Sequence, residues 1–233
     1  MIAKRKEHWA IVERWFSQRH TWPRIQFGAW LLMLFICGAA LPYILINRFS
    51  QWQGRSTINI HSPLDDAVPF VPWMIVFYIS FYAYFPIMMW MGAAEHRRTS
   101  ALIAVQELIV ATWLAFGVFL LLPVHVDLRG EVSANSFDFI INLLHALDSP
   151  YNAWPSLHVL QSFLVVLVAR TWLIEARQWH TSLAICVWLS WVLLCLSTLL
   201  VKQHYIFDMV TGIVFGLLFW QLRMKNAVNG TQN

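Results

Sequence analysis

Six long runs of apolar residues limit what this 233-residue chain can fold into. Each run is free, or nearly free, of Asp, Glu, Lys and Arg, and a helix of about 20 such residues crosses the roughly 30 Å hydrocarbon core of a bilayer. The runs cover residues 25–47, 67–94, 99–126, 149–169, 178–201 and 209–222. Backbone groups in lipid must be bonded within the protein, and the alternating pattern of a membrane strand is missing. Each run is therefore predicted to be a transmembrane helix.

The composition agrees with this fold class, because 59% of the residues are hydrophobic and only 12% are charged, against roughly a quarter charged in a soluble domain. We therefore predict an all-α membrane protein, a bundle of six transmembrane helices. The three cysteines lie inside apolar runs, which favours neither a disulfide framework nor a metal site. The small net charge of +4 is concentrated near one surface and favours lipid contact over nucleic acid.

The distribution of basic residues predicts the orientation of the bundle. Of 16 Lys and Arg residues, twelve flank one set of helix ends and only Arg48, Arg55, Arg129 and Lys202 flank the other. By the positive-inside rule both termini are cytoplasmic, and the long connections 48–66 and 127–155 lie outside. We expect a multi-pass protein of the cell membrane, of the bacterial inner-membrane kind, with its chemistry facing the periplasm or exterior.

Three regions follow from this topology. Residues 25–225 form one transmembrane catalytic domain, and residues 226–233 form a cytoplasmic tail. Residues 1–24 are a basic cytoplasmic segment, for which a helix lying on the inner leaflet and a frayed tail are both open readings. Glu107 is a charge within the third run, near its cytoplasmic end. A structural, hydrogen-bonded role is favoured there over a proton relay or substrate contact.

Polar residues gather where the fourth and sixth runs meet the outer surface. Pro155 ends any preceding helix and Ser156 is a good N-cap, so a helix should begin there with His158 in its first turn. The free N–H groups of that turn bind anions. His204 and Asp208 are four residues apart and share one face if the sixth helix starts near residue 202. An imidazole fixed by a carboxylate keeps its other nitrogen free to react.

Each of these residues alone is a weak signal, but together they suit phosphoryl transfer. Cations and N–H groups hold a phosphate while one His attacks phosphorus and the other protonates the departing oxygen. Arg48, at the end of the first run, and Lys202 are the candidate cations, with Arg55 and Arg129 as weaker ones. No Asp-rich or His-Glu-x-x-His cluster offers a metal site, so we expect a reaction without metal or other cofactor.

The chain resembles the type-2 phosphatidic acid phosphatase superfamily in two motifs, Pro155-Ser156-Leu157-His158 and the series Ser197, His204, Asp208. The usual forms of these motifs are Pro-Ser-Gly-His and Ser-Arg-x5-His-x3-Asp, and the spacing matches. The resemblance covers the chain from Arg48 to about Gly212. Six helices with the motifs at their outer ends also fit that family.

The resemblance implies a role for each matching residue. His204 would be the nucleophile that forms a phosphohistidine, and Asp208 would hold it in the reactive tautomer. His158 would protonate the leaving oxygen and then activate water. The residues expected to bind phosphate or substrate are Ser156, Ser197, Tyr205 and Asn152, together with the cations Arg48 and Lys202.

The sequence also departs from the family pattern. Leu157 replaces Gly, Thr198 stands where the third motif has Arg, and no Lys-x6-Arg-Pro first motif is found. The chain is in this respect similar to the branch that holds fungal inositol phosphorylceramide synthase and, more distantly, sphingomyelin synthase. Those enzymes transfer a phospho-alcohol headgroup between lipids, so the resemblance leaves both hydrolysis and transfer open.

A lipid phosphate or diphosphate in the membrane is the expected substrate, whereas its attached group and the oligomeric state are not indicated. Two readings of other classes compete with an enzyme. In a transporter or channel the His and Asp residues would line a pathway, and in a non-catalytic lipid-binding protein they would bind without turnover.

Overall fold

The six expected membrane helices are present in the structure, a computed structural model that describes residues 14–54, 58–129 and 137–229. Within those residues the regular structure is helical, apart from one isolated bridge between Val124 and Asn152. The segments long and apolar enough to cross a bilayer are Arg24–Gln53, Pro72–Gly92, Glu95–Leu121, Leu157–Glu175, Thr181–Leu200 and Ile206–Asn229. The chain is therefore a multi-pass, all-α membrane protein.

Several spans consist of shorter helices joined end to end. In chain order the elements are α2 (Arg24–Phe35), the π-helix η1 (Ile36–Ala40), α3 (Leu41–Gln53), α4 (Pro63–Ala67), the 3-10 turn η2 (Pro72–Met74), α5 (Ile75–Ile79), α6 (Phe81–Gly92), the 3-10 turn η3 (Glu95–Arg97), α7 (Arg98–Leu121), α8 (Asp138–Leu147), α9 (Leu157–Glu175), α10 (Thr181–Leu200), α11 (Ile206–Phe219), the π-helix η4 (Trp220–Met224) and α12 (Lys225–Asn229).

Some helices begin or end at other residues than the apolar runs, because a proline or a capping residue sets the helix end. The fourth run starts at residue 149, but α9 starts at Leu157, because Pro150 and Pro155 keep the preceding residues out of a helix. The sixth span continues through α12 to residue 229, beyond the expected end of the membrane domain at 225. Most of the basic N-terminal segment, residues 1–13, and the tail from 230 lie outside the described residues.

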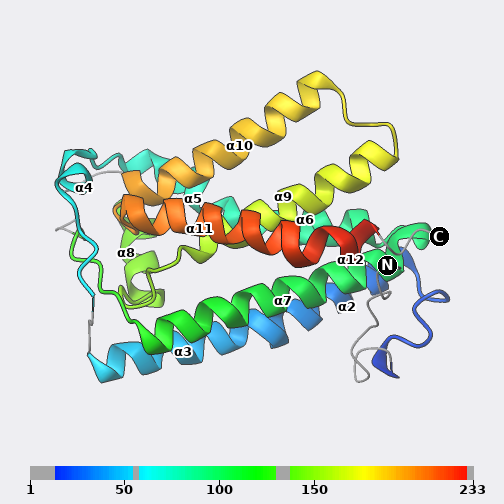
Figure 1. Ribbon diagram of the computed structural model, residues 1–233, viewed down its shortest axis with the longest axis horizontal. Helices are drawn as coiled ribbons and strands as arrows, with labels where there is room; N and C mark the ends of the chain where they lie inside the picture. The colour runs from blue at the N-terminus through cyan, green and yellow to red at the C-terminus, as the bar shows by residue number, and fades with distance from the viewer. Residues whose placement is uncertain (1–13, 55–57, 130–136, 230–233) are drawn as a thin grey trace.

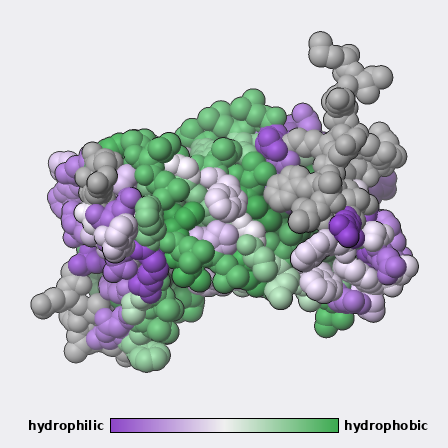
Figure 2. Space-filling model, turned by 90° about the horizontal axis from the view of Figure 1, so that it is seen from below, coloured by the Kyte–Doolittle hydropathy of each residue, from purple (hydrophilic) through white to green (hydrophobic). Residues whose placement is uncertain are grey.

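The two described ends of the chain lie together. The start of α2 and the end of α12 meet at one end of the bundle, and α4 and α8 lie at the other (Figure 1). A hydrophobic belt separates two ends where hydrophilic residues gather (Figure 2). This is the surface that a protein crossing a bilayer presents.

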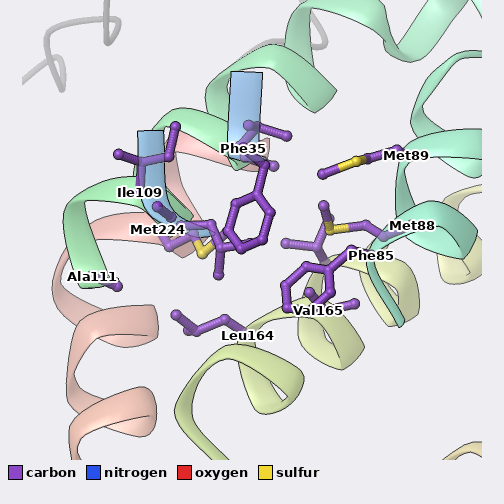
Figure 3. Packing of buried hydrophobic residues seen from close by; sticks show 14 of the residues in the cluster. Phe35, Phe85, Met88, Met89, Ile109, Ala111, Leu164, Val165 and Met224 are labelled. Carbon is purple, nitrogen blue, oxygen red and sulfur yellow. The ribbon is translucent and has the colours of Figure 1, made fainter. Parts of the chain in front are cut away.

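The main hydrophobic core lies between α2, α6, α7, α9 and η4. Phe35 and Phe85 stack with their ring centroids 4.5 Å apart, and Met88, Leu164 and Met224 belong to the same cluster (Figure 3).

The charged side chain within α7, Glu107, is paired with an arginine. Arg223 Nε lies 2.5 Å from Glu107 Oε2. This ion pair satisfies a carboxylate that would be costly in lipid, and it supports the structural reading of Glu107.

The π-helix η1 interrupts the α-helical first span at mid-length. A π-turn takes one more residue than an α-turn and leaves backbone groups without their usual partners. One of these groups is satisfied by a neighbouring helix, because Trp113 Nε1 of α7 donates to the Gly38 carbonyl at 2.8 Å. Its small residues Ala39 and Ala40 line a cavity, described below.

The first turns of α9 and α11 pack unusually close together at Gly212. A Cβ atom at Gly212 would lie 2.9 Å from the Ser156 carbonyl oxygen and 3.3 Å from the Val159 Cβ. The Ser156 N–H also donates to the Asp208 carbonyl across the same contact, at 3.2 Å. Glycine at 212 therefore allows the two helix ends to come into backbone contact.

Replacing Gly212 by Ala should separate these helix ends, since the nearest atom in its way is a backbone oxygen that cannot rotate aside. We expect Gly212→Ala to lower the thermal unfolding temperature in detergent by several degrees, which corresponds to about 1–3 kcal/mol for an overpacked site. The matched control is Gly117→Ala on α7, where nothing lies within 4 Å of the added methyl group. That change should be neutral or stabilising by up to about 1 kcal/mol. Equal unfolding temperatures for the two variants would contradict the close approach.

Candidate active site

Two imidazoles that are far apart in the sequence are in direct contact. His158 Nδ1 and His204 Nε2 are 3.4 Å apart, and their ring centroids are separated by 5.6 Å. Both rings are more than nine-tenths buried. The convergence that the two motifs predict is thus present in the structure.

Asp208 completes the cluster on the far side of His204. Its Oδ2 atom lies 3.3 Å from His204 Nδ1 and accepts a hydrogen bond from the Tyr205 N–H at 2.9 Å. A carboxylate can only accept, so Nδ1 of a neutral His204 carries the proton and Nε2 keeps a lone pair. For the contact between the two rings to be attractive, His158 Nδ1 must then be the donor. The geometry thus assigns a proton to each ring.

The start of α9 fixes His158. Ser156 is the N-cap, and its Oγ accepts from the Val159 N–H at 3.5 Å. The aromatic rings of Tyr78 and Phe81 each lie 4.5 Å from the His158 ring, centroid to centroid. These contacts leave the imidazole little freedom to turn, so its Nδ1 edge stays directed at His204.

A turn between α10 and α11 fixes His204. Its backbone N–H donates to the Thr198 carbonyl at 3.2 Å, and α11 begins only at Ile206. The condition stated for this pair, a sixth helix that starts near residue 202, is not met. Residues 201–205 form the turn, and Asp208 reaches back from the third position of α11. The side chains still meet, since an N-terminal carboxylate at that position faces the preceding residues.

A neighbouring loop supports this turn. Asp65 of α4 accepts from the Ile206 N–H at 2.7 Å through Oδ1, and from the Ser62 backbone and hydroxyl through Oδ2. Burial alone would raise the pKa of Asp65, but the hydrogen bonds from Ile206 and Ser62 outweigh it and leave this pKa below its ordinary value. The first residue of α11 is therefore capped by a carboxylate from far along the chain.

Three of the expected phosphate-binding residues lie in the framework of the site rather than on its inner surface. Lys202 Nζ donates to the carbonyls of Asp65 and Val68, at 3.0 and 2.5 Å. The Ser197 hydroxyl donates to the Leu194 carbonyl at 2.6 Å. The Tyr205 hydroxyl accepts from the Asp127 N–H at 3.0 Å and donates to a carbonyl of the same loop. The structure does not bring these three side chains to the His pair.

The His pair opens into a cavity of about 640 Å³. Its polar end is lined by His158, His204, Asn152, Gln203, Arg48, Arg129 and Asp148. Its apolar arm runs along the first span, past η1, and is closed by α6 and α8. Of the residues expected to bind substrate, Asn152 and Arg48 are at the cavity, whereas Ser156 caps α9 beside it.

Two arginines stand where the missing first-motif cations would be needed. Arg129 enters from the loop before α8, and Arg48 from the end of α3. Asn152 is 6% exposed, and among the described residues neither of its side-chain heteroatoms has a hydrogen-bond partner; the same holds for Gln203 Oε1 and Arg129 Nε. Buried polar groups are rarely left unpaired without a reason. All three residues belong to the wall of the cavity beside the His pair. Arg55, the remaining candidate cation, lies outside the described residues.

α8 and the role of Asp148, the residue that follows it, were not predicted from the sequence. Ten residues are too few to span a bilayer, so α8 does not stand out as a long apolar run, although its apolar positions recur at helical spacing. Asp148 Oδ1 accepts from the Tyr43 hydroxyl at 2.5 Å and from Asn47 Nδ2 at 3.2 Å. In the described part of the chain no group of three or more His, Cys, Asp or Glu side chains is placed to hold a metal ion.

Comparison with known families gives a direct assignment. A family model described as the PAP2 superfamily matches residues 47–222, well over half of the chain and both motifs. The chain therefore belongs to this superfamily, and it is a membrane enzyme of the phosphatase or phosphotransferase type. Searches of curated proteins and of solved structures return no match to it.

The two cations Arg129 and Lys202 should behave differently toward an anion. Arg129→Gln removes a guanidinium that faces the cavity, so the affinity for vanadate, a phosphate mimic, should fall roughly tenfold or more. Lys202→Met removes a charge that is bound to backbone carbonyls, so it should lower the unfolding temperature and leave the affinity unchanged. Affinity is measured from the vanadate-dependent rise in unfolding temperature. Equal losses of affinity would contradict this placement of the two cations.

Proposed function

We propose that this chain is a metal-independent lipid-phosphate phosphatase that works through a phosphohistidine. The single observation that carries the proposal is the contact between His158 Nδ1 and His204 Nε2, with Asp208 behind His204. The nucleophile, its orienting carboxylate and a proton donor thus lie in one line. This line ends at the polar end of a cavity whose other arm is apolar.

In the first step the phosphate enters from the cavity and separates the two rings. The His204 Nε2 lone pair, released from its hydrogen bond, attacks phosphorus and forms the N–P bond as the bond to the alcohol oxygen breaks. His158, which must enter this step as the doubly protonated imidazolium, gives its Nδ1 proton to that oxygen and is left as the neutral ring. Asp208 stabilises the positive charge that forms on the His204 ring. Arg129, Arg48 and the N-terminal turn of α9 would hold the phosphate oxygens.

In the second step His158, now without that proton, accepts one from water. The hydroxide attacks the phosphohistidine, phosphate leaves, and His204 Nε2 regains its lone pair. An alcohol in place of water would give transfer instead of hydrolysis. The test therefore follows both free phosphate and any new phospholipid.

The apolar arm of the cavity supports a lipid substrate. Phe35, Ile36 and Ala39 of the first span and Phe85 of α6 line it, and several residues of its outer wall are exposed to the surrounding lipid, among them Ile44, Tyr82 and Leu147. A phosphate at the His pair would then carry its chain into this arm.

The site lies at the end of the bundle away from most of the basic residues. Arg24, Arg98 and Arg223 belong to the end where α2 begins and α12 finishes, whereas α4, α8 and the starts of α9 and α11 are at the other (Figure 1). Under the positive-inside rule the termini are cytoplasmic and the site faces the periplasm or exterior.

Substitutions at the three central residues should separate their roles. We expect His204→Ala to abolish phosphate release from lipid phosphates, by a factor on the order of 10⁴ or more, because the attacking nitrogen is lost. His158→Ala should leave slow turnover and accumulate a phosphoenzyme, since water activation is impaired. Asp208→Asn should cost on the order of a hundredfold or more. Release of phosphate from a lipid panel, with acid-labile label retained on the protein, gives the measurement. Undiminished activity of His204→Ala would falsify the mechanism.

Filling the apolar arm should change the preference for chain length. Ala39→Phe places a ring in the arm, so KM for a phosphate with a long chain should rise roughly tenfold, as expected from two or three methylene groups kept out. A six-carbon phosphate should be turned over as before. The control is Leu45→Phe, since Leu45 is on α3 but is 72% exposed and not part of the cavity wall. An unchanged ratio between the long and short substrates would argue against a chain in this arm.

A further inference from the structure

Asp148 is a carboxylate on the wall of a cavity that is expected to hold a phosphate. It follows α8 directly, and its N–H donates to the Leu144 carbonyl at 2.9 Å. Tyr43 and Asn47 of α3 both donate to Oδ1. Asn47 also binds the next residue, since its Oδ1 accepts from the Ser149 N–H at 3.1 Å and from the Ser149 hydroxyl at 2.7 Å. The carboxylate is thus held in one orientation.

The two nearby arginines do not neutralise Asp148 by direct contact. Arg129 Nη1 donates to the Asp148 backbone carbonyl at 2.6 Å, and Arg48 Nη2 donates to the Ala146 carbonyl at 3.3 Å. Among the described residues no ion pair within 4 Å and no hydrogen bond involves the second carboxylate oxygen, Oδ2. Asp148 lines the cavity, and its Oδ2 is not among the fully buried unpaired atoms of the described chain. Oδ2 is therefore available to a ligand in the cavity.

The free Oδ2 of Asp148 would repel the phosphate of a ligand. The ligand group that contacts Oδ2 must therefore be a hydrogen-bond donor. Burial raises the pKa of the Asp148 carboxyl, and the Tyr43 hydrogen bond and the charges of Arg129, His204 and Arg48 only partly oppose the rise. The carboxylate thus lacks part of the hydrogen bonding that it would have in water, and a ligand donor would restore it. An ammonium group would meet the two guanidinium groups on the same wall. A neutral hydroxyl group would not.

We propose that Asp148 is a specificity residue that accepts a hydrogen bond from a free hydroxyl group on the alcohol part of the lipid phosphate. This inference rests on the proposed function, because it places the phosphate of the same molecule at His204. It identifies the substrate class as lipid phosphates that carry a hydroxyl group beside the phosphate ester. Lipids without that hydroxyl group would bind to the same catalytic residues more weakly.

The test uses matched substrates and the full chain in detergent. A single-chain glycerol phosphate with a free hydroxyl on the second carbon is compared with its 2-deoxy and 2-amino analogues, which have the same chain and phosphate. For the wild-type enzyme we expect KM to be about tenfold lower for the hydroxyl substrate than for the deoxy analogue, the usual size of one hydrogen bond to a charged group. Asp148→Asn should remove this difference by raising KM for the hydroxyl substrate alone.

Two further variants serve as controls. Asp66→Asn removes a carboxylate from the same end of the protein, but its side chain is 64% exposed and pairs with His61 outside the cavity, so the preference should persist. Tyr43→Phe keeps the Asp148 carboxylate and removes one of the two hydrogen bonds to Oδ1, leaving the bond from Asn47, so the hydroxyl preference should shrink but remain.

The wild-type comparison alone can overturn the inference, even if Asp148→Asn fails to fold. Equal KM for the hydroxyl and deoxy substrates, or a lower KM for the amino analogue, overturns it. If Asp148→Asn raises KM equally for the hydroxyl and deoxy substrates, Asp148 has a structural role only, and the inference is overturned as well. In all these cases turnover that depends on His204 leaves the proposed function intact. No phosphate release from any substrate overturns both.

Discussion

Backbone contact between the first turns of α9 and α11 is the constraint on which the rest of the site depends. Gly212 permits it, and the Ser156 N–H bonded to the Asp208 carbonyl fixes its register. Once these helix ends touch, His158 faces the turn that carries His204, and Asp208 reaches the opposite side of the His204 ring. The cluster is therefore a product of helix packing in the membrane, where small residues allow close approach.

The loops at this end have a common function, which is to hold the turn at His204 from outside. Asp65 caps the start of α11, Lys202 binds the carbonyls around α4, and Tyr205 binds the loop that leads to Arg129. Their polar groups bind mainly backbone atoms, and these bonds hold the turn that carries His204 between the two helices. Asn152 and Gln203, which each carry a buried side-chain atom without a hydrogen-bond partner among the described residues, lie at the wall of the cavity.

The sequence predicted the parts of this structure that depend on local pattern. Run length gave the six spans, and the spacing of His204 and Asp208, with Pro155 and Ser156 before His158, gave the cluster. Long-range contacts were not predictable in the same way. Lys202 looked like a phosphate ligand because a charge near a nucleophile suggests one, but its partners are carbonyls at residues 65 and 68, which no spacing connects to it. Asp148 was missed because it needs α8 to bring it to the cavity. Arg129 was ranked low for the same reason.

The π-helix η1 determines which side of α3 faces the cavity. Each residue of an α-helix turns the chain by about 100°, so the one extra residue held in η1 sets the rotation of everything after it. Tyr43, Asn47 and Arg48 all follow η1 and all bind the C-terminal end of α8 or the residues just after it. A single-residue deletion within 36–40 would restore a regular helix, yet it would swing this whole polar edge about a quarter turn toward lipid. The irregular turn η1 in the middle of the first span thus decides which side chains of α3 reach the site.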